Sequence, residues 1–289
     1  MAEEDADTVL HIADGQHAVV SPEYTGVDLP LSANMDEVLL PYLELKMHLD
    51  FERRVVRCLA TYTLEVPAGR APPQHVVFDC CDLAVYAVAD ADTGEALCFN
   101  LSSVLLRVHA SRRTGVLPRR VAIEYSTLPR CHSVLFAPDA DGKPCCFTCG
   151  SPMNNRSWLP GADCERTLLR YDAEVSVPDG AVAIWSAPLA EPPCLVCSPG
   201  EACRTLYRFR MDYALPPSTI AFAVGWFSHA DVPGMPEGIP ATLYAPQSLI
   251  GALQSEYGAL LPRYVRLIVD ALGEFPFARS DVAIMPPCL

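Results

Sequence analysis

Lysine is nearly absent from this chain of 289 residues: only Lys46 and Lys143 occur, and the other 19 of its 21 basic residues are arginines. Asp and Glu together number 35, which leaves a net charge of −14. An acidic chain is repelled by the phosphate backbone of DNA or RNA. We therefore expect no nucleic-acid partner.

Long hydrophobic runs and a basic N-terminus are also missing. No run of about 18 apolar residues occurs, and a helix needs roughly that length to span a bilayer. The chain begins Met-Ala-Glu-Glu-Asp, whereas a secretory signal begins with basic residues. We expect no membrane partner and a cytoplasmic location, with the nucleus as the second possibility. In such a compartment the 13 cysteines, an odd number, are expected to be reduced thiols rather than a disulfide framework.

The motifs of hydrolytic chemistry are missing too. None of the seven histidines stands four positions from another, so no His-Glu-x-x-His zinc helix is present. The sequence has no Gly-x-Ser-x-Gly nucleophile elbow and no glycine-rich phosphate loop. We therefore predict no catalytic residue and no catalytic metal ligand in this chain.

Cysteines offer the one pattern that could hold a metal. Two Cys-x-x-Cys pairs could supply four thiolates to a tetrahedral structural zinc. The four candidate ligands are Cys146, Cys149, Cys194 and Cys197. The alternative is a set of reduced thiols in turns, and the pattern alone does not decide between the two.

Alternation of apolar and polar residues is the strongest structural signal. Over 43–51, 56–66 and 169–177 every second residue is apolar, which is typical of a strand with one face in a core and one in water. Shorter β-rich runs follow this pattern at 76–79, 83–88, 104–110, 121–125, 182–186, 206–213 and 219–226. Many short strands without intervening helices predict a mainly β chain, an antiparallel sandwich or saddle.

The two ends of the chain differ from this middle part. Residues 1–28 hold seven Asp and Glu residues and no Lys or Arg, so we predict a disordered acidic tail over 1–27. Residues 228–240 are rich in Gly and Pro and are predicted to be a linker or loop.

Helical spacing begins after the loop. Apolar residues recur at this spacing over 247–260 and 262–272, and Gly273 is suited to a helix C-cap. A strand is predicted at 281–285. We expect residues 228–289 to be the incomplete start of a second unit, with an exposed stripe on the second helix formed by Tyr264, Leu267, Ile268 and Leu272.

One stretch resembles a known family. Residues 142–163 resemble the end of the N-terminal β-domain of gluzincin aminopeptidases, with Arg156, Leu159-Pro160 and Asp163 at the positions of family motif residues. The resemblance covers roughly residues 28–287. The other segments that carry it are Asp28-Leu29-Pro30-Leu31 with Ala33-Asn34, Asp50-Phe51-Glu52, Phe78 to Leu83, Ile220 to Gly225, and Phe275 to Val282.

The resemblance implies a fold and a function. It implies a saddle-like antiparallel β-sandwich over 28–227, followed over 228–289 by the short α/β start of a thermolysin-like catalytic domain. Family members are zinc metallopeptidases (hydrolases) that remove N-terminal residues from peptides, and their zinc motif falls outside this chain. We therefore expect an N-terminal portion that lacks the catalytic centre and binds no cofactor itself.

The family also implies candidate substrate contacts. In related enzymes a Gln or Glu about five residues before the motif Arg helps to hold the free amine of the peptide. Ser151 stands at that offset from Arg156, and Pro152 follows it, so these two are the candidate substrate-binding residues. Two other readings remain open: a non-catalytic binding or regulatory β-domain protein, and a structural protein with a cysteine-held zinc.

Overall fold

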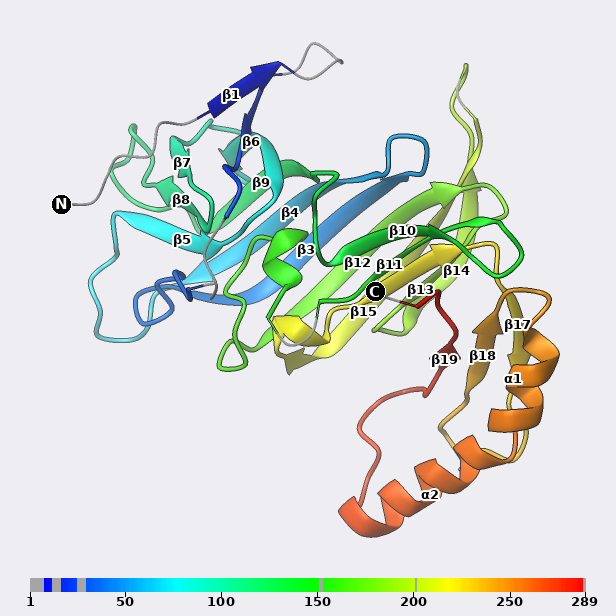
Figure 1. The fold of residues 1–289 in the computed structure, drawn as a ribbon. Helices are drawn as coiled ribbons and strands as arrows, with labels where there is room; N and C mark the ends of the chain where they lie inside the picture. Colours follow the sequence, from blue (N-terminus) through cyan, green and yellow to red (C-terminus); the bar gives the residue numbers. More distant parts are fainter. Residues whose placement is uncertain (1–7, 12–16, 25–29, 151–152, 201, 288–289) are drawn as a thin grey trace.

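Most of the alternating segments build one long, twisted sheet (Figure 1). The computed structural model describes residues 8–11, 17–24, 30–150, 153–200 and 202–287. The large sheet has the strand order β1-β2-β6-β9-β4-β3-β12-β15-β14. The bounds of these strands, in that order, are Thr8–His11, His17–Val20, Leu83–Asp90, Arg120–Thr127, Val55–Glu65, Leu39–Asp50, Leu169–Pro178, Arg204–Leu215 and Leu189–Val196.

The predicted period of two is confirmed in the central strands. In β3, Leu43, Leu45 and Met47 are buried, while Glu44 and Lys46 between them are exposed. Strand β12 alternates in the same way. Burying one such side chain contributes roughly 1.5–3 kcal/mol relative to leaving it in water, so this pattern fixes which face meets the core.

One pairing departs from the predicted antiparallel arrangement. Strand β12 runs parallel to β3, with Tyr171 beside Leu43 and Val175 beside Met47. Among the described residues, the other pairings of this sheet are antiparallel. The parallel pair joins two antiparallel halves of the sheet, and residues 179–188, between β12 and the β14–β15 hairpin, contain a strand of another sheet.

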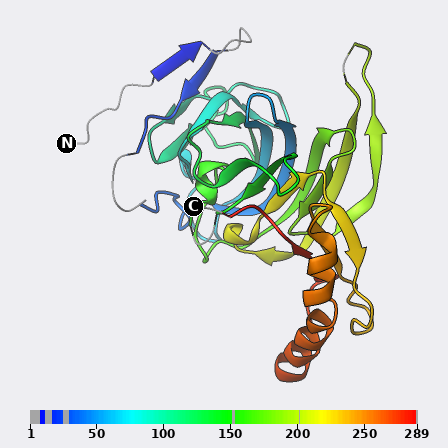
Figure 2. The ribbon, with the colours of Figure 1, turned by 45° about the vertical axis from the view of Figure 1, so that its right-hand side comes forward.

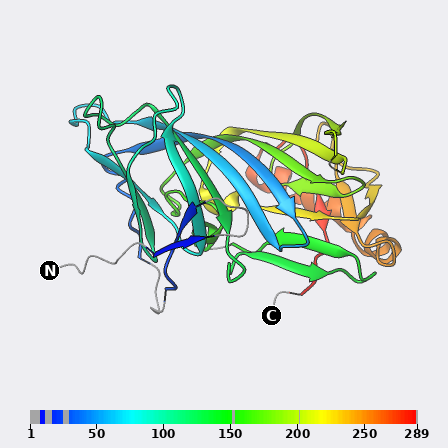
Figure 3. The ribbon, with the colours of Figure 1, turned by 90° about the horizontal axis from the view of Figure 1, so that it is seen from above.

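Two smaller sheets share the core of the large sheet, so that strands β1 to β16 together form a sandwich, which we call the β-unit (Figures 1 and 3). One has the order β5-β8-β7, with bounds His75–Asp79, Leu105–His109 and Phe99–Leu101. The other has the order β10-β11-β16-β13, with bounds Val134–Pro138, Pro144–Thr148, Phe222–Gly225 and Val182–Trp185. Two 3-10 turns, η1 (Asn155–Ser157) and η2 (Pro217–Thr219), lie in the connections.

The C-terminal segment forms a small unit with its own core (Figure 2). Its sheet has the order β17-β18-β19, with bounds Ser228–Asp231, Thr242–Ala245 and Val282–Ala283. The predicted helices are present as α1 (Ile250–Tyr257) and α2 (Leu260–Leu272). Gly273 caps α2 with a φ of 92°, a backbone conformation that favours glycine. No helix among the described residues is both long enough and apolar enough to cross a bilayer.

Three predictions need correction. Strands β1 and β2 lie within the segment predicted to be a disordered tail, and Ala18 and Val20 of β2 are buried beside β6. The rest of 1–27 is only partly described. The predicted loop 228–240 contains β17, which pairs with β18. Strand β14 was not predicted because none of its residues is buried, so its sequence lacks alternation and it forms by pairing with β15.

Candidate functional site

Three distant segments of the chain meet at one buried arginine. The guanidinium of Arg156 is fully buried in the turn η1. Its Nε donates to Oδ2 of Asp163 at 3.0 Å, and its Nη1 donates to the carbonyl oxygen of Pro30 at 2.6 Å. The same Nη1 lies 3.8 Å from Oδ1 of Asp79, at the end of β5. A buried charge needs such partners, because removing it from water costs several kcal/mol.

Asp79 is held by backbone groups as well as by this charge. Its Oδ1 accepts hydrogen bonds from the amides of Ser32 (2.6 Å) and Ala33 (3.2 Å), and its Oδ2 accepts one from the amide of Asp163 (3.1 Å). Burial raises the pKa of Asp79, against the opposing effect of these hydrogen bonds and of Arg156. The motif residues of segments 30–34, 78–83 and 156–163 therefore form one buried cluster, which anchors the fold and offers no exposed group for chemistry.

The segment before Arg156 is held by the side chain of Asn155, which lies close to three stretches of backbone. Asn155 is buried, and its Nδ2 donates to the carbonyl oxygens of Pro217 (2.6 Å) and Ile220 (3.0 Å). The indole of Trp158 donates to Asn155 Oδ1 at 2.9 Å. A Cβ at Gly150 would come within 1.8 Å of that same oxygen, so only glycine fits there.

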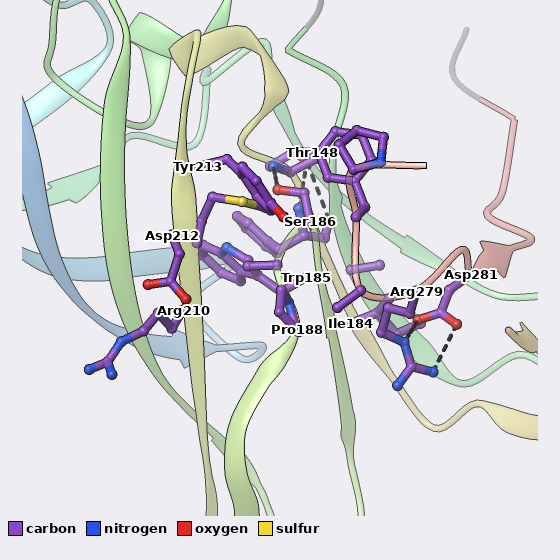
Figure 4. Close-up of a pocket in the computed structure, with 18 of the residues that line it drawn as sticks. Thr148, Ile184, Trp185, Ser186, Pro188, Arg210, Asp212, Tyr213, Arg279 and Asp281 are labelled. Atoms are coloured by element: carbon purple, nitrogen blue, oxygen red, sulfur yellow. Dashed lines mark hydrogen bonds and ion pairs between the residues drawn. The ribbon is translucent and has the colours of Figure 1, made fainter. Parts of the chain in front are cut away.

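A cavity of about 710 Å³ lies between the β-unit and the C-terminal segment (Figure 4). Most of its wall is aromatic or aliphatic, which suits it to apolar groups. The residues that line it come from the ends of β11, β13, β15 and β16 and from the segment after α2. They include Phe147, Thr148, Ile184, Trp185, Ser186, Met211, Tyr213, Phe222, Phe275, Phe277, Arg279 and Met285.

Several polar groups of the cavity wall already have partners. The hydroxyl of Thr148 accepts a hydrogen bond from the amide of Phe222 at 3.0 Å. Arg279 forms a two-pronged ion pair with Asp281, at 2.5 and 2.8 Å. No histidine or cysteine is among the described residues that line the cavity. The described lining also contains the hydroxyl of Ser186 and the carboxylate of Asp212, but no histidine stands beside them to complete a nucleophile–base pair. The arrangement mainly offers a surface for apolar side chains.

The two candidate substrate contacts, Ser151 and Pro152, lie outside the described residues. Their neighbourhood in the sequence is described on both sides. Thr148, at the end of β11, lines the cavity, and Gly150 packs against the side chain of Asn155. The role of Ser151 and Pro152 therefore stays a prediction. In the sequence, the two residues come shortly after Thr148, which lines the cavity.

The four cysteines of the candidate structural zinc are not brought together. Cys197 forms a disulfide with Cys203 at the tip of the β14–β15 hairpin, which also corrects the expectation that all thiols are reduced. Cys146 is buried in β11, where burial raises the pKa of its thiol well above the usual value. Cys194 is exposed in β14 of the large sheet, and Cys149 is exposed just after β11, a strand of another sheet. A zinc site needs thiolates that converge, so this alternative is wrong for Cys197 and without support for the others.

Within the part of the chain that the structure describes, no three His, Cys, Asp or Glu side chains are grouped so that they could hold a metal ion. The donor set therefore does not fit a catalytic zinc, which needs about three protein ligands and an open position for water.

Comparisons with known proteins identify the fold and its relatives. No family model matches the chain. It is 27% identical to human aminopeptidase O over 282 residues, which covers 82% of this chain and 32% of that protein. It is 28% identical to mouse aminopeptidase B over 145 residues, which covers 50% of this chain and 20% of the relative. The chain is thus similar in sequence to part of each of these aminopeptidases.

Solved structures give the same result for the fold. Yeast LTA4 hydrolase in complex with bestatin matches with a TM-score of 0.73 at 18% identity, over 91% of this chain and 40% of that one. An M1 zinc metallopeptidase from Deinococcus radiodurans matches with a TM-score of 0.69 at 17% identity, over 88% of this chain and 57% of that one. The chain has the mainly β fold of the N-terminal domains of these enzymes, and it spans about a third of the length of human aminopeptidase O.

Proposed function

We propose that this chain is the N-terminal portion of a zinc aminopeptidase that removes N-terminal residues from peptides. The observation that carries the proposal is the buried cluster around Arg156. It joins the same three segments that resemble the family in sequence, and it does so within a fold shared with M1 metallopeptidases. The zinc of such an enzyme would be bound by residues other than those described, because these contain no group of ligands.

We propose further that the cavity face receives the remainder of a catalytic domain. The supporting observation is the apolar wall, to which Trp185 and Phe222 of the β-unit and Phe277 of the C-terminal segment contribute. Trp185 and Phe222 are themselves buried, but Tyr213 and Phe277 of the same wall are exposed, and exposed aromatic side chains at one place are suited to contact with a further part of the protein. Ser151 and Pro152 come shortly after the cavity-lining strand β11 in the sequence, and the proposal assigns them a contact with the bound peptide.

The second candidate function is a non-catalytic binding protein made of this β-unit. The size of the cavity supports it, since pockets of roughly 300–1,000 Å³ hold small ligands. The two candidates differ in what an added catalytic part would do. If the chain is part of a peptidase, the added catalytic part restores turnover. If the chain is a binding protein, the added part either competes with the ligand for the cavity face or has no effect.

The proposed location is the cytoplasm. The supporting observation is the set of free thiols, of which Cys58, Cys80 and Cys146 are fully enclosed in the core. A reducing compartment favours so many unpaired cysteines, although the pair Cys197–Cys203 would then be open to reduction.

Activity measurements with and without a catalytic part test the proposal. The purified chain alone should show no chelator-sensitive hydrolysis of aminoacyl coumarin amides. The chain fused to the catalytic part of human aminopeptidase O should hydrolyse them, and a chelator should abolish that activity. The catalytic part alone and a fusion carrying Phe222→Asp in the cavity wall are the controls, and both should be less active than the intact fusion. Metal-dependent turnover by residues 1–289 alone would overturn the proposal, and so would a fusion no more active than its catalytic part.

A further inference from the structure

The sheet β5-β8-β7 lies at the end of the molecule away from α1 and α2 (Figures 1 and 3). Leu106 and Val108 of β8 face the core, and a cluster of basic residues lies at and beside the opposite face. His75 of β5 stands directly opposite His109 of β8, and their ring centroids are 6.5 Å apart. Arg107 precedes His109 by two positions in β8 and so shares its face, and it is exposed. Arg112, in the turn after β8, is exposed as well.

These positive charges are not balanced by carboxylates. Neither Arg107 nor Arg112 has a side-chain hydrogen bond or ion pair among the residues that the structure describes. Arg113, by contrast, pairs with Glu95 at 3.2 Å. On the large sheet, Arg120 pairs with Glu44 and Asp92. In a chain with a net charge of −14, unpaired cations gathered at one place are a local reversal of sign.

The cations affect one another. The pKa of His109 is lowered, first by its partial burial and then by the positive charges of His75, Arg107 and Arg112. Like charges in proximity disfavour protonation, so the side chains lie within electrostatic range of one another. A bound anion would relieve this repulsion.

Asn100 of β7 orients the ring of His109. Its Oδ1 lies 2.7 Å from Nε2 of His109. An amide oxygen only accepts hydrogen bonds, so Nε2 carries a proton and donates it. In the neutral ring Nδ1 is therefore left without a proton, and on protonation it becomes a second donor. A ring held in this way can add one donor to a site as the pH falls.

Two ligand classes can use facing imidazoles, and the surroundings favour one of them. A divalent metal would add two positive charges beside Arg107 and Arg112 and would find only two imidazole ligands. A dianion with several oxygens would instead match the two guanidinium forks and the imidazoles. We propose that His75, Arg107, His109 and Arg112 form a binding site for a tetrahedral dianion, the phosphoryl group of a phosphate monoester. This site is separate from the cavity face and does not depend on the proposed peptidase function.

Sulfate is the probe that isolates the effect of pH. It stays a dianion over the range in which imidazole titrates, whereas a phosphoryl group gains a proton near a pKa of about 6. The groups that face His109 are His75 on β5, Arg107 on its own strand, Arg112 in the turn and Asn100 on β7. Two carboxylates lie near: Glu95 is engaged by Ser111 and Arg113, and Glu37 by Asn34, whose Nδ2 also donates to the carbonyl oxygen of His75. Sulfate should therefore bind more tightly as the pH falls from about 7.5 to about 5.5, because protonated His109 adds a donor and a charge.

The experiment compares two double variants of the full chain by calorimetry, with amide chemical shifts to locate the bound ion. R107Q/R112Q removes two charges from the site. R170Q/R263Q removes two charges from exposed arginines elsewhere, one at β12 and one on α2. We expect R107Q/R112Q to bind sulfate about tenfold or more weakly, since each charge-assisted contact contributes roughly 1.4 kcal/mol or more. The control variant should change affinity less than about twofold.

The source of the phosphoryl group is distinguished by three further titrations, with phenyl phosphate, a phosphoserine peptide and the same peptide unphosphorylated. Tighter binding of the phosphopeptide than of phenyl phosphate supports a protein ligand, and equal binding supports a small monoester. The proposal is overturned by equal losses in both double variants, by shifts outside the β5–β8 face, or by sulfate affinity that does not rise at low pH. Preferential binding of a single-stranded oligonucleotide with a steep salt dependence would also overturn it, in favour of a nucleic-acid surface.

Discussion

Arg156 shows how a charge is kept in the interior of a β-sandwich. Its side chain and that of Asp79 are fully buried, and Asp163 is nearly so. Desolvating each ion is unfavourable by several kcal/mol, and the ion pair offsets this only because backbone amides and carbonyls complete the hydrogen bonds. The neighbours Pro30 and Ser32 belong to the segment before β3, so the charge also attaches that segment to the core.

Removing this charge should be strongly destabilising. In Arg156→Met the carboxylates of Asp79 and Asp163 stay buried without a cation, so we expect a loss of roughly 3–5 kcal/mol in the free energy of unfolding. Arg156→Lys should lose less, because it keeps the charge but not the two-pronged geometry. Urea denaturation followed by tryptophan fluorescence measures both. The exposed Arg113→Met is the matched control, and its midpoint should barely move. A loss below about 1 kcal/mol in Arg156→Met would contradict the account.

Single residues divide into those that the sequence could and could not predict. Arg156 and Asp163 are recognisable because they lie seven positions apart in one motif. Their partners Pro30 and Asp79 are distant in the chain, so only the folded backbone brings them together. The disulfide Cys197–Cys203 was missed for a related reason. The odd number of cysteines shows that they cannot all pair within the chain. It does not show that the β14–β15 hairpin places Cys197 next to Cys203.

Among the elements, α2 bears out its predicted pattern most fully. All four residues of the predicted stripe are exposed, with Leu267 at 55% and Leu272 at 81%. The opposite side of the helix, with Leu261 and Val265, is buried in the small C-terminal core. The helix therefore has apolar residues on two sides. The small core covers one side, and none of the described residues covers the other.

Charges on that stripe should suppress self-association. We expect L267E/L272K to stay monomeric at concentrations at which the wild-type chain associates, because exposed apolar patches drive contact between copies. Sedimentation velocity over a concentration series measures this. Leu261→Glu serves as the control, since it places a charge in the small core and should unfold the C-terminal unit instead of improving its behaviour. If the double variant associates as strongly as the wild type, the stripe is not the contact surface.

Strands were predictable where one face meets the core and the other meets water. This holds for β3, β4 and β12, whose alternation is unbroken over most of their length. It fails for β14, which is exposed on both faces and contains Pro192-Pro193. It fails also for β10 and β11, a hairpin of short strands that turns at Asp141-Gly142. In each strand, three consecutive residues are buried to a similar degree, so buried and exposed residues do not alternate. Such strands form because a partner strand is present, and a single sequence does not display its partners.

At the scale of the whole molecule, the two largest of the four apolar cores differ greatly in size. The large core runs through all three sheets of the β-unit. The small core consists of Val232, Ala241, Leu243, Ala245, Leu253, Leu261 and Val265. The change from alternation to helical spacing after about residue 228 predicts a second unit there, and the resemblance to a known family implies the same boundary. In the small sheet, β19 lies within the strand predicted at 281–285, whereas β17 and β18 were not predicted, because four residues are too few to show alternation.

The smaller core should open first. We expect the amides of β18 and α2 to exchange with deuterium at least about tenfold faster than those of β3 and β12, because fewer buried apolar groups oppose local unfolding. Hydrogen exchange read by mass spectrometry, with the urea-unfolded chain as the reference, gives both rates. Equal protection in the two units would mean that they unfold as one.

The parallel pairing of β3 with β12 determines the order in which the strands of the large sheet can pair during synthesis. Tyr42 donates its hydroxyl proton to Asp172, a residue 130 positions further along the chain. When β3 leaves the ribosome it can join β4 at once, but its other edge has no neighbour until β12 has been made. Loop closure over such a distance is slow. For that interval the middle of the future sheet is an open edge, so the nascent chain is most exposed to wrong strand pairing while residues 51–168 are being translated.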